Sequence, residues 1–364
     1  MKTLFDTPQK LIKYAVGLLG IVILALLPIF PIPLPGILPE IGRTPAAYLS
    51  LIILCLIYAA FALTYHLLLG VSGMLSFGHA LFFGAGAYGF GILLNHFGVN
   101  WILGIFLTFI FGGLLSLLVG LVANRVSGIP FAMVTLAFAE AGQIWVKRNA
   151  PITNAEDGLF VTQFLPKDLI KVSETQNMYW FILAMFLIVF FVVAWVEKSR
   201  VGSVAKATRE NELRVKVLGI QSYKVKVIMF LAAGGMASLV GVAYVISTQS
   251  AVPTNISANT TIMVLLMVVL GGVGYRWGAI VGAVAFTLLD HRLVSTLGEA
   301  EWIEQLPPIL SVPLSEPHFI LGALFILVVI FLPGGIVGTI DRLLKGQSLK
   351  RRTAKQLLLK DSHE

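Results

Sequence analysis

Long apolar stretches recur along this chain and leave little room between them. An apolar run of about 20 residues crosses the hydrocarbon core of a bilayer as an α-helix. Such a segment is helical because lipid offers its backbone no hydrogen bonds. Runs of this kind, or somewhat shorter, lie at 11–30, 47–69, 79–95, 100–124, 128–146, 178–196, 227–248, 260–273, 278–290 and 317–333. The sequence therefore predicts an all-α, polytopic integral membrane helical bundle.

Two of these runs, 260–273 and 278–290, are too short to cross about 30 Å of hydrocarbon as isolated helices. They flank Gly271, Gly272 and Gly274. We therefore predict a broken pair buried among other helices rather than two clean spans. The bundle then has about eight to ten transmembrane helices, and the lower count applies if this pair and the third or fifth run are re-entrant.

The composition agrees with a membrane protein and excludes several classes of protein. Hydrophobic residues make up 57% of the chain and charged residues 12%, whereas a soluble domain has about 25% charged residues. The single cysteine, Cys55, excludes a disulfide within the chain and a multi-cysteine metal site. The net charge of +8 is concentrated in one loop and one tail, which favours membrane topology over nucleic-acid binding.

The basic residues predict the orientation. Segment 197–226 holds eight Lys and Arg residues and the part of the chain after 340 holds seven, whereas 290–316 is acidic. Because cytoplasmic loops are enriched in Lys and Arg, both basic regions and both termini are expected in the cytoplasm. We predict one transmembrane domain over 1–340, with a basic cytoplasmic tail at 341–364 that can also contact anionic lipid.

Enzymatic motifs are missing. The chain has no P-loop and no His-Glu-x-x-His. Gly84, Gly86 and Gly89 spell the dinucleotide-binding pattern, but they lie inside an apolar run with no acidic residue between Glu40 and Glu140. Close helix packing explains them better. We therefore expect no enzymatic activity and no cofactor bound by this chain.

The first candidate for a substrate pathway is 70–91, where Ser72, Ser76 and His79 lie among glycines between two apolar runs. Transporters build substrate sites at discontinuous helices of this kind. The alternative is small-residue packing, with His79 at the cytoplasmic boundary.

The second candidate is the run 128–146, in which Glu140 follows Thr135 by five residues and precedes Gln143 by three. An acidic residue inside the membrane is expensive and often marks a pathway. The alternative places Glu140 near the outer interface, in contact with water.

The third candidate is 203–219, which we predict to be one amphipathic helix of about four turns, capped by Ser203 and ended by Gly219. A short helix on the cytoplasmic face suits the groove of a partner protein or the lipid surface.

These segments together resemble a known family, the M-type permeases of the Liv system. Those permeases are membrane subunits of ATP-binding-cassette importers for branched-chain amino acids. The resemblance rests on an ordered set of short matches at 75–88, 135–140, 156–159, 209–212, 218–219, 270–274 and 333–336.

The resemblance implies several partners: a second, homologous permease, two cytoplasmic ATPases that bind ATP and Mg²⁺, and an extracytoplasmic substrate-binding protein. It also implies a bacterial or archaeal plasma membrane. The family's coupling helix corresponds to 203–219, with Arg209, Glu210, Asn211, Glu212 and Gly219 as its contact residues. The usual importer signature Glu-Ala-Ala-x-x-x-Gly is not matched, because Glu212 to Gly219 is one residue longer.

We expect the cargo to be leucine, isoleucine or valine. Urea or a short amide, carried by relatives of the family, is the alternative. An ion-coupled secondary transporter is a more distant one, since such carriers usually hold several charges within the membrane. For the pathway we single out polar residues and glycines that interrupt helices: Ser76, His79, Thr135, Glu140, Gly271, Gly272 and Gly274.

Overall fold

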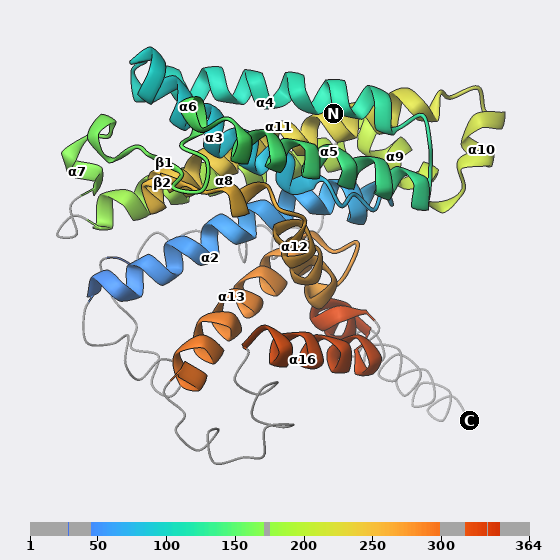
Figure 1. Cartoon of the computed structure of the whole chain (residues 1–364). Coiled ribbons are helices and arrows are strands. Elements are labelled where there is room, and N and C mark those ends of the chain that lie inside the picture. Colours follow the sequence, from blue (N-terminus) through green and yellow to red (C-terminus); the bar gives the residue numbers. More distant parts are fainter. Residues whose placement is uncertain (1–27, 29–44, 171–174, 299–316, 333, 343–364) are drawn as a thin grey trace, which may run out of the picture.

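The chain is helical almost throughout the parts described by the computed structural model, which are residues 28, 45–170, 175–298, 317–332 and 334–342. The long helices are α2 Pro45–His66, α3 His79–Phe97, α4 Trp101–Ala123, α5 Ile129–Arg148, α8 Thr175–Lys198, α11 Ser222–Thr248, α12 Ala258–Gly271, α13 Arg276–Gly298 and α16 Pro317–Phe331. The shorter elements are η2 Leu67–Val71, α6 Ala150–Thr153, β1 Leu159–Phe160, η3 Thr162–Phe164, α7 Lys167–Ile170, α9 Arg200–Glu210, α10 Glu212–Val217, β2 Ser250–Ala251 and η5 Pro253–Ile256. The predicted all-α membrane fold is confirmed (Figure 1).

Six helices of the described ranges are long and apolar enough to cross a bilayer, and the bent pair α12–α13 would make a seventh. They match the runs predicted between 47 and 248, and α12 and α13 confirm the predicted broken pair. The run at 317–333 corresponds to α16, which has 15 residues. The run at 11–30 and nearly all of the tail 341–364 lie outside the described residues, so the count of eight to ten stays a prediction.

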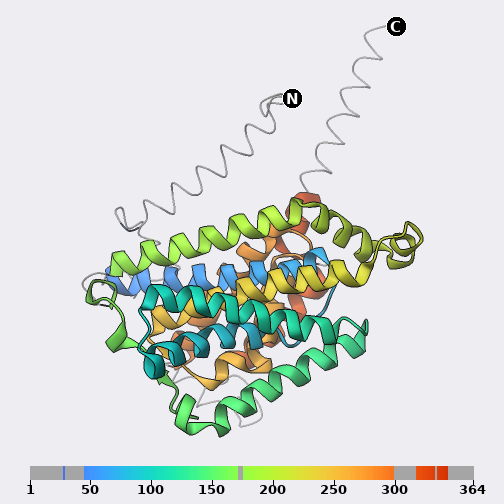
Figure 2. The same ribbon diagram turned by 90° about the horizontal axis from the view of Figure 1, so that it is seen from above.

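Helices α3, α4, α5, α8 and α11 run roughly alongside one another between two ends of the bundle, whereas α12 and α13 lie across them (Figures 1 and 2). At one end, α9 and α10 lie near the turn between α2 and α3, since Arg209 contacts Gly70. At the opposite end, β1 pairs antiparallel with β2, with Leu159 opposite Ala251. The sequence places the segments that meet at each end on the same side of the membrane, which agrees with the predicted alternation of spans.

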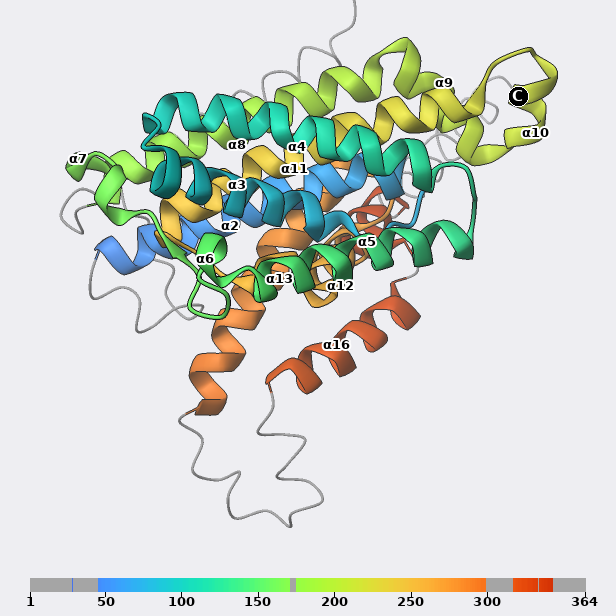
Figure 3. The same cartoon turned by 45° about the horizontal axis from the view of Figure 1, so that its top comes forward.

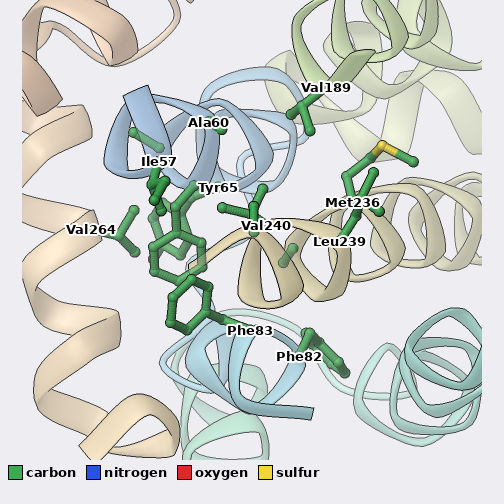
Figure 4. Close-up of a cluster of buried hydrophobic side chains, with 14 of the residues drawn as sticks. Ile57, Ala60, Tyr65, Phe82, Phe83, Val189, Met236, Leu239, Val240 and Val264 are labelled. Carbon is green, nitrogen blue, oxygen red and sulfur yellow. The ribbon is translucent and has the colours of Figure 1, made fainter. Parts of the chain in front are cut away.

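Helix α11 lies in the middle of the bundle and packs against α2, α3, α4 and α8. Figure 4 shows part of this core, where Met236, Leu239 and Val240 of α11 lie among side chains of the neighbouring helices. Small residues let the backbones approach closely. A Cβ on Gly86 of α3 would overlap the carbonyl of Ser238 in α11, so packing explains this glycine pattern, as the sequence indicated.

Helices α4 and α5 lie at the outside of the bundle and expose large apolar side chains, among them Phe106, Leu118 and Met133. Exposing such a surface to water is unfavourable, whereas contact with lipid or with another membrane subunit is favourable. In Figure 3, α16 lies at the edge of the bundle, where it packs against α12 and α13.

Candidate functional site

The first interruption of the bundle separates α2 from α3. A π-helical turn, η2, ends at Ser72, whose hydroxyl donates to the carbonyl of Leu67 at 2.9 Å. Gly73 follows with φ +69°, a conformation that favours glycine. The chain then runs without regular structure to the start of α3 at His79. We call residues 72–78 the first break.

Side chains from other helices satisfy the polar groups of the first break. The Thr135 hydroxyl of α5 accepts from the Phe77 amide at 3.1 Å and donates to the Ala132 carbonyl at 2.9 Å. The Ser76 hydroxyl accepts from the Gly78 amide at 3.3 Å, and the Ser76 carbonyl accepts from the Tyr65 hydroxyl at 3.0 Å. Two of the predicted pathway residues, Ser76 and Thr135, thus meet at one place.

His79 lies at the start of α3 and is fully buried. Its Nε2 is 2.9 Å from the Thr64 hydroxyl. Aromatic rings surround the imidazole, with Phe61 stacked on it and Phe82 edge-on. A substrate therefore reaches His79 only if the surrounding helices separate.

Glu140 lies away from this cluster, near the middle of α5. The buried side of α5 carries Thr135 and Ala139, and the spacing places Glu140 on the other side, with the exposed Met133 and Ile144. Its carboxylate has no hydrogen bond or ion pair within the described ranges. Glu140, an acidic residue near the middle of an apolar helix, therefore lies on the side of α5 that faces away from the rest of this chain.

The second interruption is the bend of 117° between α12 and α13. Gly272 and Gly274 adopt φ values of +119° and +98°, which side chains with a Cβ rarely adopt. A Cβ on Gly271 would overlap the Gly278 carbonyl, and one on Gly335 would overlap the backbone of Gly272. We call residues 272–275 the second break. Contacts between backbone atoms pack tightly around it.

One hydrogen bond joins the start of α3, next to the first break, to the first turn of α12. The Ala80 amide, in the first turn of α3, donates to the Thr261 hydroxyl of α12 at 2.9 Å. Of the predicted pathway residues, Ser76, His79 and Thr135 thus lie at or next to the first break and the three glycines at the second, with Glu140 separate from both groups.

The single helix predicted over 203–219 is wrong, because the chain forms two helices there. Helix α9 begins after Ser199, whose hydroxyl accepts from the Gly202 amide at 3.1 Å. Asn211 is extended and ends α9, and its side chain caps α10 by accepting from the Arg214 amide at 3.0 Å. Asparagine offers the backbone this alternative to a continuous helix. Gly219, with φ +78°, follows α10 as the left-handed stop that was expected.

The coupling residues chosen from the sequence mostly contact their own chain. The Arg209 guanidinium donates to the Gly70 carbonyl of η2. Glu212 pairs with Lys226 of α11 at 2.7 Å and with Lys216 at 3.1 Å. Partial burial alone would raise the pKa of Glu212, but these two ammonium groups outweigh it and lower the pKa of the carboxyl below its usual range.

Part of the surface that α10 presents to solvent is apolar, alongside the exposed Arg214 and Lys216. Leu213, Val217 and Leu218 are 73%, 87% and 75% exposed, and we call them the α10 tip. Their amphipathic spacing is visible in the sequence, but which residues point outward depends on how Asn211 and Glu212 hold α10.

Sequence reasoning missed a cluster of charged and titratable residues on four different helices: His66, Glu197, Lys206 and Arg276. Glu197 and Arg276 stand at the ends of apolar runs, where charged residues are ordinarily solvated. The available signal was Glu197, the only acid between Glu174 and Glu210. Within the described parts of the chain, no group of three or more His, Cys, Asp or Glu side chains could hold a metal ion.

The fold and its two breaks define a multi-pass helical membrane protein with interrupted helices. Residues 47–329 match the family described as branched-chain amino acid transport system / permease component, and the chain belongs to this family. The match includes both breaks, α9 and α10.

Individual relatives show the breadth of the similarity. The chain is 23% identical to the high-affinity branched-chain amino acid transport system permease protein LivM of Escherichia coli K12, over 78% of this chain and 68% of that one. It is 25% identical to the probable LivM of Methanocaldococcus jannaschii, over 74% and 81%. It is also 23% identical to the fructose import permease protein FruG of Bifidobacterium longum, over 58% and 65%. No solved structure is significantly similar to this chain.

Proposed function

We propose that this chain is the membrane-spanning permease subunit of an ATP-driven importer that carries leucine, isoleucine and valine into the cytoplasm. The observation that carries this proposal is the match of residues 47–329 to branched-chain amino acid permeases. Relatives named LivM in a bacterium and an archaeon support this cargo. The importer lies in the plasma membrane with both termini of this chain in the cytoplasm.

Two cytoplasmic ATPases supply the energy by docking on the α10 tip. Leu213, Val217 and Leu218 together form an apolar surface on a short helix that charged residues flank. Such a surface fits an apolar groove of a partner, in the way that short amphipathic helices bind grooves. Asn211 and Glu212 hold α10 in position for this contact. ATP and Mg²⁺ bind to those partner subunits, and this chain binds no cofactor.

A second, homologous permease covers the outward side of α5. Placing the Glu140 carboxylate against lipid would cost about 3 kcal/mol. A subunit interface or a water-filled pathway removes that cost. We place the substrate pathway between the two permeases, where Glu140 attracts the ammonium group of an amino acid delivered by an extracytoplasmic binding protein.

The backbone groups at the two breaks complete this pathway. A zwitterion leaves water only if dipoles meet both of its charges, and interrupted helices supply such dipoles. Ser76, His79 and Thr135 keep the first break in shape, and Gly271, Gly272 and Gly274 shape the second.

The proposal is tested by uptake of labelled leucine in cells with and without this gene, in the presence of unlabelled competitors. We expect uptake to depend on the gene and to fall when isoleucine or valine is added, but not when urea or fructose is added. Gene-dependent uptake of labelled urea or fructose, without any gene-dependent uptake of leucine, would contradict the proposed cargo and leave the importer class in place.

A further inference from the structure

Four charged or titratable side chains from four helices converge at the end of the bundle near α9. They are His66 of α2, Glu197 of α8, Lys206 of α9 and Arg276 of α13. We call them the Glu197 junction, because each of the other three faces the carboxylate of Glu197.

The junction is largely shielded from solvent. The side chains of Glu197 and Arg276 are 15% and 20% exposed, and that of His66 is 1% exposed. Taking charges out of water costs several kcal/mol per ion, so such a cluster is a weak source of stability. What it does provide is a fixed connection between helices that are far apart in the sequence.

The two carboxylate oxygens of Glu197 differ in their contacts. Lys206 Nζ lies 2.8 Å from Glu197 Oε1, a charge-assisted hydrogen bond. Arg276 Nε and His66 Nε2 lie 3.7 and 3.9 Å from Glu197 Oε2, which is too far for hydrogen bonds. A small displacement of α13 relative to α8 would therefore form a hydrogen bond at Oε2 or lengthen the contacts there, while α9 stays attached at Oε1.

Arg276 stands at the start of α13, directly after the second break. Its guanidinium lies over the ring of Phe190 in α8, 5.4 Å from the ring centre, and the rings of Phe190 and Trp277 are 5.5 Å apart. The end of α13 that leaves the bend is thus attached to α8 by one ionic and two aromatic contacts.

Helix α9 also contacts the region between the breaks directly. The Arg209 side chain passes over Gly73 of the first break and donates to the Gly70 carbonyl. A Cβ placed on Gly274 of the second break would lie 3.4 Å from Arg209 Nη1. One short helix therefore touches both breaks, through Arg209 directly and through Lys206 by way of Glu197.

We propose that the Glu197 junction transmits movement of α9 to the bend between α12 and α13, with Glu197 as the positioning residue. This inference rests on the proposed function, since it assumes that a docked ATPase moves α9 and α10. When α9 moves, Lys206 carries Glu197 with it, the contacts at Oε2 rearrange, and Arg276 shifts the start of α13.

The test is the number of leucine molecules taken up per ATP hydrolysed, measured with the complete importer complex in liposomes. Lys206→Gln is the first variant, because its side chain is 49% exposed and its loss leaves Glu197 facing Arg276. Glu197→Gln is the second. Glu197→Gln combined with Arg276→Gln is the third, and it avoids an unpaired buried charge. Lys198→Gln, an exposed neighbour of Glu197, is the matched control.

We expect the first three variants to lower the leucine-to-ATP ratio by about tenfold, a typical coupling effect, while ATP hydrolysis and assembly of the complex are retained. Lys198→Gln keeps the wild-type ratio. A merely structural role would lower assembly, hydrolysis and uptake together, and an unchanged ratio in Lys206→Gln and the double variant would overturn the inference. A wild-type complex without ATP-driven uptake of any cargo would contradict the proposed function itself, and this inference with it.

Discussion

The two breaks interrupt the bundle at the same end but are held together by different forces. At the first break, hydroxyl groups of Ser76 and Thr135 hold backbone amides at defined distances. At the second, Gly271 and Gly335 allow backbone to lie directly against backbone. Directional bonds fix one geometry, whereas van der Waals contacts between glycines permit small sliding movements. The first break is therefore suited to a fixed scaffold and the second to a moving joint.

The largest effect is expected when one methyl group is added at the second break. We expect Gly271→Ala to abolish leucine uptake, because the added Cβ would overlap the Gly278 carbonyl and overpacking costs about 1–3 kcal/mol or more. Uptake and the amount of subunit in membranes are measured together. The control is Gly322→Ala, since a Cβ there meets no atom within 4 Å. Wild-type uptake by Gly271→Ala would show that the second break is not closely packed.

A variant of Glu140 tests whether the substrate pathway lies on the outward side of α5. We expect Glu140→Gln to lower leucine uptake by about tenfold, the loss of one charge-assisted contact, without lowering the amount of subunit in the membrane. Glu156→Gln is the control, because this acid is exposed and paired with Lys147. Unchanged uptake by Glu140→Gln would remove Glu140 from the pathway.

At the first break, Thr135→Val keeps the shape of the side chain but leaves the Phe77 amide without its acceptor. An unsatisfied buried amide costs about 1–3 kcal/mol. We expect a lower thermal unfolding temperature of the purified complex and a partial loss of uptake. Thr135→Ser retains the hydroxyl and should behave nearly as wild type. Equal stability of the Val and Ser variants would mean that this hydrogen bond does not hold the break.

The smallest effect concerns α10. The folded-state pKa of Glu212 is lowered by Lys226 and Lys216, so its contribution to holding α10 in place is present above the ordinary pKa of a glutamate and is lost as the pH falls through the lowered pKa. The measurement is the rate of pepsin cleavage within 212–218, relative to Glu212→Gln at the same pH. We expect wild type to be cleaved more slowly near pH 5 and equally fast at lower pH. A ratio that does not change with pH would contradict this role for Glu212.

The helices and the second break were predictable from the sequence. Apolar length and interrupting glycines are local features, and a bilayer requires a minimum helix length and satisfied backbone hydrogen bonds. The division of 203–219 into two helices was not predictable. The residue pattern around Asn211 is compatible with a continuous helix, and the break arises because the Asn211 side chain caps α10. The partners of Arg209 were also hidden, because Gly70 is far away in the sequence. The same holds for Glu197 and Arg276, which meet only after the helices have packed.

In the proposed function, ATP hydrolysis by partner subunits drives transport through this chain. The most direct measurement is labelled leucine uptake by liposomes that contain either the complete complex with its binding protein or this chain alone, with and without ATP. We expect uptake only with the complete complex and only with ATP. Leucine accumulation by this chain alone, driven by a proton or sodium gradient without ATP, would contradict the claim and indicate an ion-coupled carrier.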